Sequence, residues 1–582
     1  MIQAVARPRG RRREDGRPGP GRPAFRLAAG IALLVLSPPL AAQHREADLF
    51  SGTVAAPPGA AAAEGDVIRL LEQATFGPTE DLIAHVRKEG IEAFLAEQFA
   101  APPSRYPALP QVPASTREGC PDGSPPNCVR DNYSMYPLKL AFFQNALWGP
   151  DQLRQRVALA LHEILVVSGL KVRPPSAMAR YLNMLAENAF GNYRTILRDL
   201  TLNPAMGRYL DMVNNDKANE KGTIVPNENY AREVLQLFSI GVDLLHSDGT
   251  VQLDKDGNPV PTYSQDTIED FAHVFTGWTF APLPGNEILK HNPPNWLEPM
   301  WLFRDVTGND VNHDKGAKQL LIYPGAVSPT IDAGLDGAVE LEQALDNIFH
   351  HPNVGPFIGR QLIQHLVTSN PSPAYVAHVA AAFDDNGSGV RGDLKAVVSA
   401  ILLDPEARGA VRSEANYGHL REPVLFITGL CRAFGASSDG ILDGPAVAMG
   451  QDLFQAQSVF SYYPHAYEIV GAAVEGPEFG IQSTAAALAR MNFVNALAFS
   501  KFRPEKATTG TSLDLSRLLP LAGDPALLVG ALDRLLLHQT MSDAMKGAVT
   551  GAVSSVPAAS PLLRAQTAVY LVASSSQYQV ER

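Results

Sequence analysis

Residues 152–167 read QLRQRVALALHEILVV, and this stretch says more about the fold than any other. After Arg156 it is apolar on every side of a helix, interrupted only by His162 and Glu163. A helix that is apolar all round lies in the core of a large protein. The stretch therefore predicts a buried helix in a mainly α-helical protein.

The two interrupting residues, His162 and Glu163, need buried partners, because a buried charge without one is costly. Arg154 lies two turns before His162, on the same face of the helix. No second histidine completes the His-Glu-x-x-His pattern of zinc enzymes. A core histidine with satisfied hydrogen bonds is the favoured interpretation, and a catalytic or ligand role is the alternative.

Helical periodicity continues on both sides of this stretch. We expect helices over residues 138–148, 151–168, 176–188, 193–201, 204–213, 227–240, 264–275, 338–350, 353–368, 373–384, 391–403, 418–433, 483–500, 525–538, 541–553 and 560–573. The best strand signal is 251–260, where Asp256-Gly257 supplies a hairpin turn. Residues 278–336 are rich in Gly, Pro, Trp and Asn and lack a helical period. The predicted fold is mainly α and multi-lobed, with a small β-hairpin and a long aromatic loop.

The length of 582 residues exceeds the roughly 250–300 that one hydrophobic core usually supports. We expect a signal peptide at 1–42 and an Ala/Pro/Gly-rich linker at 43–65. An N-terminal helical lobe with the hairpin and long loop would follow at 66–336, and a C-terminal helical lobe at 337–582.

The first 42 residues predict export, because they have the basic, apolar, small-residue order of a secretory signal. Eight arginines precede the apolar run 27–36, and Leu40-Ala41-Ala42 offers small residues for cleavage. A disordered basic tail is the alternative. The route, general secretory or twin-arginine, stays open. We expect a periplasmic or extracellular protein.

Charge excludes two kinds of partner. The chain has 48 basic and 60 acidic residues, net −12. Without residues 1–42, which hold eight basic and two acidic residues, 40 and 58 remain, net −18. Nucleic acid and anionic membranes both require a basic patch, so we expect neither as a partner. No later apolar run reaches the roughly 18 residues of a spanning helix, so no transmembrane segment is expected after cleavage.

The three cysteines divide into a pair and a single residue. Cys120 and Cys128 share one loop, and in an oxidising compartment we expect them to form a disulfide. A two-cysteine zinc site is the alternative, although the loop contains no histidine. Cys431 stands in an apolar helical pattern and is expected in the core.

The densest polar cluster is PNENYARE, residues 226–233, which opens a helix. Helical spacing places Glu228 beside Arg232 and Asn229 beside Glu233. Such a mixture of acid, base and amide could form a substrate site. The catalytic candidates are Glu228, Arg232 and Glu233, and the binding candidates are Asn227, Asn229 and Tyr230. A capped helix with a salt bridge that ties it to a neighbour is the favoured interpretation, and the substrate site is the alternative.

A second cluster, NHDKGAK at 312–318, ends the long aromatic loop. His313 and Asp314 are candidates for proton transfer or for a ligand role, with Trp278 and Lys318 as binding candidates. A capped turn is an equal alternative. The sequence indicates no metal site by ligand spacing, and it leaves the cofactor unknown.

These motifs together resemble a bacterial family described only as domain of unknown function 1800. The resemblance rests on residues 69–79, 152–156, 226–233, 275–278, 313–318, 391–394, 458–464, 476–479 and 577–582. It implies export, a mainly helical fold and a gene association with a second exported family that looks like sulfatases and alkaline phosphatases. It implies no reaction and no catalytic residues.

Two functional hypotheses follow. In the favoured one, the protein is an envelope factor that binds or matures an exported partner, such as the phosphatase- or sulfatase-like one. In the other, it is an exported hydrolase acting on an envelope or extracellular polymer. Glu228 or Glu233 would then be the acid/base, Arg232 would hold an anionic group, and His313 with Asp314 would complete the site. The second hypothesis predicts that the two polar clusters meet in one cleft.

Overall fold

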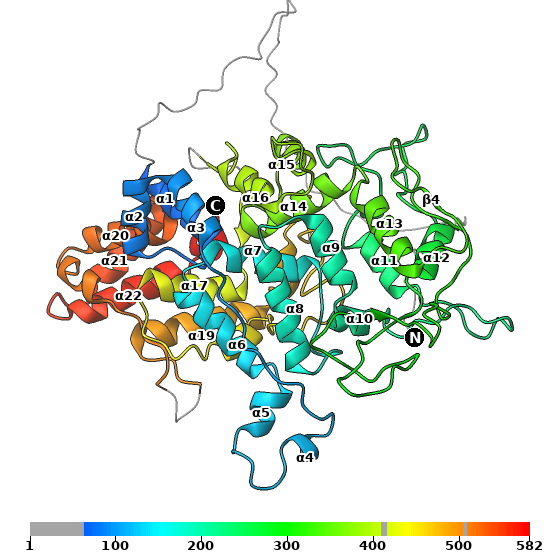
Figure 1. Ribbon diagram of the computed structural model, residues 1–582. Coiled ribbons are helices and arrows are strands. Elements are labelled where there is room, and N and C mark those ends of the chain that lie inside the picture. The colour runs from blue at the N-terminus through cyan, green and yellow to red at the C-terminus, as the bar shows by residue number, and fades with distance from the viewer. Residues whose placement is uncertain (1–62, 409–415, 505–508) are drawn as a thin grey trace, which may run out of the picture. The chain divides into compact units, whose positions relative to one another are not determined.

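A computed structural model describes residues 63–408, 416–504 and 509–582, and most of this chain is helical (Figure 1). The predicted signal peptide and nearly all of the predicted linker lie outside the described residues. The first helices are α1 (Glu64–Ala74), α2 (Glu80–Glu89), α3 (Ile91–Ala100), α4 (Thr116–Gly119), α5 (Cys128–Tyr133), α6 (Tyr136–Trp148), α7 (Gln152–Ile164), α8 (Pro175–Asn188), α9 (Tyr193–Thr201), α10 (Pro204–Tyr209), α11 (Asn229–Gln236) and α12 (Gln265–Val274).

The later helices include two short 3-10 segments, η1 and η2. They are α13 (Gly337–Phe349), α14 (Val354–Leu366), α15 (Pro373–Asp384), α16 (Leu394–Leu403), α17 (Pro423–Ala433), α18 (Asp443–Ala448), η1 (Pro477–Ile481), α19 (Thr484–Phe499), η2 (Ser516–Leu521), α20 (Pro525–Leu537), α21 (Asp543–Ser554), α22 (Pro561–Ala573) and α23 (Ser576–Gln579).

The strands are short antiparallel pairs: β1 (Trp278–Thr279) with β2 (Trp301–Leu302), β3 (Lys318–Gln319) with β4 (Thr330–Ile331), and β5 (His419–Leu420) with β6 (Val580–Glu581). The predicted hairpin is also present, as single bridges that join Leu245 to Val251 and Leu253 to Pro259. Gly257 has φ +80° in its turn, a conformation that glycine adopts without steric cost. The mainly α prediction is confirmed.

Most predicted helices are present, and their ends differ for local reasons. The Asn227 side chain accepts a hydrogen bond from the Asn229 N–H (2.9 Å), so α11 begins at residue 229 and not at 227. The helix predicted from residue 418 begins only at Pro423, because residues 419–420 pair as β5 with the C-terminal strand β6. Cross-strand pairing with a distant segment leaves no signal in the local pattern.

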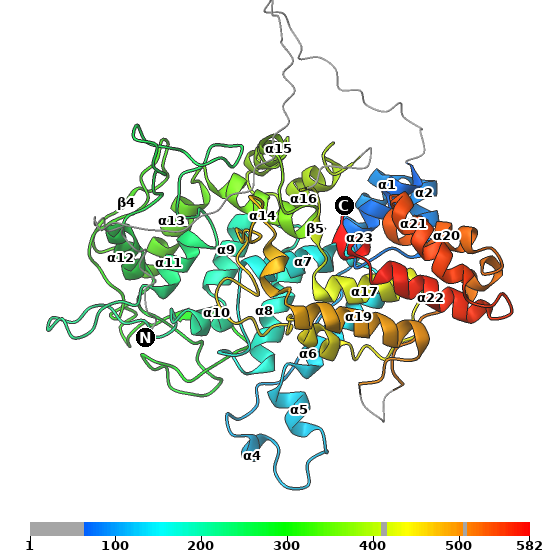
Figure 2. The same ribbon diagram turned by 180° about the vertical axis from the view of Figure 1, so that it is seen from behind.

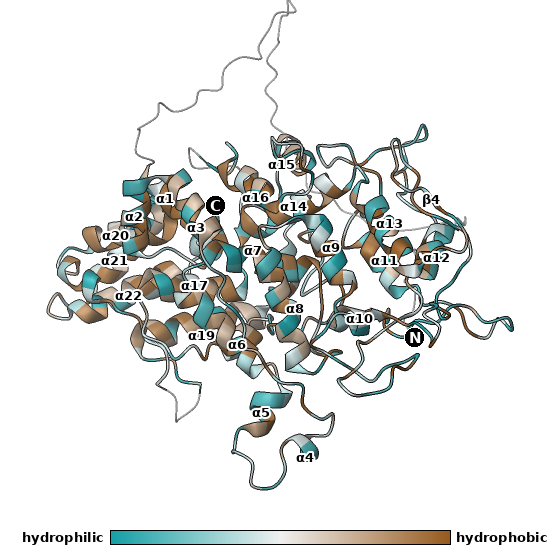
Figure 3. Cartoon of the chain, viewed as in Figure 1, coloured by the Kyte–Doolittle hydropathy of each residue, from teal (hydrophilic) through white to brown (hydrophobic). Residues whose placement is uncertain are grey.

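The helix α7 is buried as predicted, with Arg154 its only residue that is not fully buried. It packs against α8 and α14, and further contacts come from α1, α3 and α6. Hydropathy colouring shows hydrophobic residues concentrated on the packed helices, and hydrophilic residues along many loops (Figure 3). Loss of apolar surface to water at these contacts is the main stabilising contribution.

Residues 61–582 form one compact unit. Helices from both sides of the boundary expected at residues 336 and 337 pack together, as α9 does with α13, α7 with α14 and α6 with α17. The first helices α1 and α2 lie beside α20 and α21, as both views show (Figures 1 and 2). The division into two lobes stays a prediction.

A buried ionic network joins the first helix to the C-terminus. The Arg421 guanidinium lies 2.8 Å from Glu72 Oε2 and 3.0 Å from Glu581 Oε2. His538 Nε2 also lies 2.6 Å from Glu72 Oε2, and Arg421 Nε donates to the Tyr578 carbonyl (2.8 Å). Charges taken out of water need such close and multiple partners.

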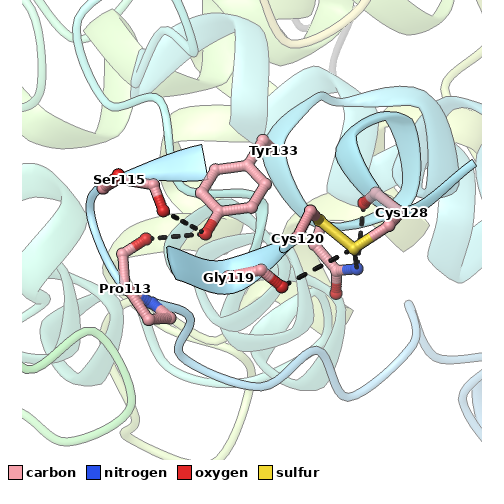
Figure 4. Close-up of a disulfide and its surroundings, with 7 residues drawn as sticks. Pro113, Ser115, Gly119, Cys120, Cys128 and Tyr133 are labelled. Atoms are coloured by element: carbon pink, nitrogen blue, oxygen red, sulfur yellow. Dashed lines mark hydrogen bonds between the residues drawn. A yellow bond between two sulfur atoms is a disulfide. The ribbon is translucent and has the colours of Figure 1, made fainter. Parts of the chain in front are cut away.

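The disulfide Cys120–Cys128 is present, as predicted, and closes the loop between α4 and α5 (Figure 4). Tyr133 packs beside it and donates its hydroxyl hydrogen toward the carbonyls of Pro113 (2.8 Å) and Ser115 (3.1 Å). Figures 1 and 2 show α4 and α5 projecting from the packed helices. Cys431 is buried in the core as expected, and burial raises the pKa of its thiol to about 12.

Candidate functional site

A small pocket lies where α7, α14, η1 and the segment 459–465 meet. Its lining includes Glu163, Gln364, His365, Phe460, Tyr463 and Glu478. The cavity has a volume of about 30 Å³, which is enough for roughly two waters. Phe460 is 43% exposed and marks the outer rim.

Two carboxylates and an imidazole converge beside this pocket. Glu163 comes from the last turn of α7, His365 from the end of α14, and Glu422 from the residue that precedes α17. His365 Nδ1 lies 3.6 Å from Glu163 Oε2 and 3.6 Å from Glu422 Oε1. The two carboxylate side chains are 1% exposed and the imidazole 12%. We call these three residues the acid–histidine cluster.

Two further side chains orient the cluster. Gln451 Nε2 donates to Glu163 Oε1 (3.0 Å) and to Glu422 Oε2 (2.6 Å). Its Oε1 accepts from the Val424 N–H (3.0 Å), which fixes the direction of the amide. The Tyr463 hydroxyl lies 3.4 Å from Glu163 Oε2. The carboxylates are therefore held in place by groups that are themselves buried.

The pKa values of the two carboxyls are shifted in opposite directions. Burial raises the pKa of Glu163 well above its usual range, and the neighbouring Glu422 charge adds to this. Burial also opposes ionisation of Glu422, but His365, Gln451 and Arg156 outweigh it and lower the pKa of Glu422 to about 2. The environment thus favours the protonated form of Glu163 and the ionised form of Glu422.

Two lining atoms lack a hydrogen-bond partner among the described residues: Glu478 Oε2 and Gln364 Oε1. Both side chains are at least nine-tenths buried. The other oxygen of Glu478 lies 3.2 Å from His419 Nδ1. Since buried polar atoms are nearly always hydrogen-bonded, these two oxygens are free to bind a ligand or water in the pocket.

A family model described as "Protein of unknown function (DUF1800)" matches residues 69–580. The chain belongs to this family. The match covers every residue of the acid–histidine cluster and of the pocket lining. No curated protein and no solved structure matches the chain. In the part of the chain that the structure describes, no helix is both long enough and apolar enough to cross a membrane.

In this DUF1800 protein, the cluster predicted at 226–233 anchors α11. Glu228 Oε2 lies 2.7 Å from Arg232 Nη2, and both side chains are about one-third exposed. The buried Tyr230 hydroxyl lies 2.6 Å from Thr201 Oγ1, and its ring meets Phe275 edge-on. These contacts resemble the favoured interpretation of a helix start with a salt bridge, although the ion pair lies within the segment and the N-cap residue Glu228 makes no side-chain cap hydrogen bond.

The two asparagines of the segment also have local partners. Asn229 donates to Asp211 Oδ2 (3.1 Å), and Asn227 exchanges hydrogen bonds with Asn215. Glu233 is half-buried, and this burial raises its pKa. None of the six candidates from this segment lines the pocket at Glu163.

The second predicted cluster is enclosed. His313 has no exposed surface, and its Nε2 lies 3.1 Å from Glu340 Oε2, which Lys318 Nζ also approaches at 2.8 Å. A Cβ atom placed on Gly277 or Gly337 would lie 2.9–3.0 Å from atoms of His313. Gly337 thus packs against the imidazole and Gly277 against the backbone and Cβ of His313, and the fully buried ring has no exposed surface for a substrate to reach.

Helices α11 and α12 pack together, and α12 contacts both α13 and β3, so the two DUF1800 motifs belong to neighbouring elements. Their candidate side chains nevertheless have separate surroundings, a surface ion pair on one side and a closed interior on the other. Trp278 is buried in β1. The pocket contains none of these groups in its lining.

The neighbours His162 and Glu163 have different environments. His162 packs edge-on against Tyr181 and Phe454, and burial lowers its pKa to about 4. Its Nδ1 has no hydrogen-bond partner among the described residues, so it is a core histidine whose hydrogen bonds are not all satisfied. Glu163 instead belongs to the pocket. The sequence signal that pointed to it was the buried polar pair in an apolar helix.

The pair His273–Asp314 beside the enclosed cluster gives a pH prediction. The ring nitrogen Nδ1 lies 3.0 Å from Asp314 Oδ2. The contact with Asp314 outweighs burial and raises the pKa of His273, with smaller effects from Lys318 and Asp270. The same contact holds the pKa of Asp314 well below its usual range.

The lowered pKa of Asp314 stabilises the fold above about pH 4, and this contribution is lost as the pH falls further. The raised pKa of His273 stabilises the fold below about pH 6.5, and this contribution is lost as the pH rises further. We expect His273→Asn to lower the free energy of unfolding most between about pH 4 and 6.5. Urea unfolding of both proteins from pH 3 to 9 measures this. A difference that does not change with pH would contradict it.

Proposed function

We propose that the protein is an exported enzyme of hydrolase type whose active centre is the pocket at Glu163. One observation carries the proposal: two buried carboxyls, an imidazole and a phenol converge at a pocket that reaches the surface at Phe460. These groups donate and accept protons or bind metal ions in hydrolytic enzymes. Buried ionisable groups with shifted pKa values that border a cleft are candidates for a functional site, whereas the buried ion pairs of Arg421 and Lys318 do not line this pocket.

The dimensions of the pocket favour a small reacting group. Space for about two water molecules admits a chain end or a side group, not a length of polymer. The exposed Phe460 ring offers an apolar surface on which the rest of the substrate can lie. We therefore propose action on a terminal or pendant group of an envelope or extracellular polymer.

Export is part of the proposal. It is supported by the basic, apolar and small-residue order of residues 1–42 and by the Cys120–Cys128 disulfide. Disulfides persist in oxidising compartments outside the cytoplasm. The role of a factor that matures an exported phosphatase- or sulfatase-like partner stays a prediction, which co-purification from the native host would test.

The test uses the purified protein with chromogenic carboxyl esters, phosphate esters and glycosides, and with isolated envelope polymer. We expect one of these classes to be hydrolysed. Glu163→Gln, which keeps the side-chain shape, should lower kcat/KM by about 10²- to 10⁴-fold, the usual contribution of one acid–base group. His365→Asn should have a similar effect.

The matched control is Glu342→Gln, which removes a carboxylate from a surface pair with Arg194 and should leave the rate unchanged. Thermal unfolding confirms that each variant is folded. Full activity in a folded Glu163→Gln protein would contradict the proposed centre. Loss of activity in Glu228→Gln instead would place the site at α11.

A further inference from the structure

We infer that Glu163, His365 and Glu422 bind one divalent transition-metal ion. The three side chains each offer a ligand atom, and these atoms all lie within 4.8 Å of one another. They come from three different elements, and their neighbours are buried, so the arrangement is set by packing rather than by a flexible surface. The inference shares its pocket with the proposed function but has its own readout.

The distances between the three side chains match those between ligands of one metal ion. The His365 Nδ1 atom lies 3.6 Å from an oxygen of each carboxylate, which is too far for a good hydrogen bond. Ligands bound to one metal at about 2.0–2.2 Å are roughly 3.4 Å apart in a tetrahedral site. The two N–O distances of 3.6 Å are therefore close to the distance expected between two ligands of the same metal ion.

A second acid–histidine group in the same region shows the contrast. His419 contacts Glu478 through Nδ1 (3.2 Å) and lies near Glu581 through Nε2 (3.8 Å). Its two ring nitrogens point to different carboxylates, so the imidazole bridges them directly. At His365 a single nitrogen faces both carboxylates, which leaves a shared point for an ion.

The surroundings also fit a metal centre. Gln451 holds one oxygen of each carboxylate and leaves the other oxygen directed at His365, as outer partners of metal ligands commonly do. The adjoining pocket supplies room for a bound water or substrate atom. Glu478 Oε2 and Gln364 Oε1, which are buried and have no hydrogen-bond partner within residues 63–408, 416–504 and 509–582, can accept hydrogen bonds from that water.

The donor set restricts the metal. Two carboxylates with one imidazole suit Zn²⁺, Mn²⁺ and Fe²⁺. Ca²⁺ and Mg²⁺ prefer oxygen ligands alone, and a site for Cu⁺ would use sulfur. Three protein ligands beside an open pocket resemble a catalytic site more than a closed structural one. A divalent ion would also balance the two carboxylate charges.

The experiment measures metal binding directly. The full protein is stripped with a chelator, and Zn²⁺ and Mn²⁺ are each titrated by calorimetry and by equilibrium dialysis with elemental analysis. We expect one ion per chain for at least one metal. His365→Asn, Glu163→Gln and Glu422→Gln should each weaken binding at least 100-fold. A rise in Tm on adding metal should appear in the natural protein and disappear in the three variants.

The matched control is His419→Asn, which removes a histidine from the other acid–histidine group and should leave the stoichiometry at one. Binding is measured only on the folded fraction isolated by gel filtration. If His365→Asn is unstable, the near-isosteric Glu422→Gln provides the test in its place. No binding of either metal, or unchanged binding in folded Glu422→Gln, would overturn the inference.

The two proposals fail separately. Metal bound at the cluster without any hydrolysis would contradict the enzyme proposal and leave the metal site standing. Hydrolysis that depends on Glu163 in a protein that binds neither metal would overturn the metal site and leave the enzyme proposal standing.

Discussion

Replacing Arg421 with Met is expected to lower the free energy of unfolding by about 3–5 kcal/mol. The guanidinium is the shared partner of Glu72 and Glu581, whose side chains are at most 3% exposed. Without it, two buried carboxylates keep only histidine contacts. Methionine fills a similar volume, so most of the loss comes from charge and not from a cavity.

Urea unfolding followed by circular dichroism measures this difference. Arg517→Met is the matched control, because Arg517 is 69% exposed and faces an exposed Asp81. Exposed ion pairs contribute little, so the control should change stability by less than about 1 kcal/mol. Equal effects of the two substitutions would show that the buried network does not stabilise the fold.

Lys318→Met is the second substitution with a large expected effect, again about 3–5 kcal/mol. Lys318 is 1% exposed and lies 2.8 Å from Glu340, which has no exposed surface. It also donates to the carbonyls of Asp314 and Gly316 (both 2.9 Å). The substitution leaves Glu340 with His313 alone and two carbonyls without their donor.

Lys315→Met, a lysine of the same loop that is 37% exposed and pairs with Asp310, is the control and should have a smaller effect. The comparison also decides what the segment 312–318 does. Loss of stability supports a structural role for the motif. A Lys318→Met protein that is stable but has lost activity would support a functional role for the segment.

Sequence patterns predicted the helices well because helical periodicity is local. The burial of α7 and the peculiarity of Glu163 were both visible in one stretch. The partners of Glu163 could not be predicted from the sequence, because His365, Glu422 and Gln451 are some 200 to 290 residues away and belong to no polar cluster in the sequence. Only packing brings them together. The segment 458–464, which contains Tyr463, resembles the family but shows no pattern of catalytic residues in the sequence.

The two polar clusters that the sequence offers as sites lie outside the pocket at Glu163, and their role as a site stays a prediction. Polar residues at 226–233 cap a helix and form surface contacts, and those at 312–318 build a buried ion network. Both uses require the same residue types as catalysis. Polar density alone therefore does not separate a site from a scaffold, whereas polar groups beside a pocket do.

The burial of Glu581 makes the packing around α1 depend on a segment far along the chain. Arg421 pairs with Glu72 directly, but its second carboxylate and the partner strand of β5 both come from residues 580–581. A protein shortened before residue 580 keeps Glu72 and Arg421 but loses Glu581 and β6. Arg421 is then left with one buried carboxylate, and β5 is left with an unpaired edge, so the contribution of these few residues to stability is large for their number.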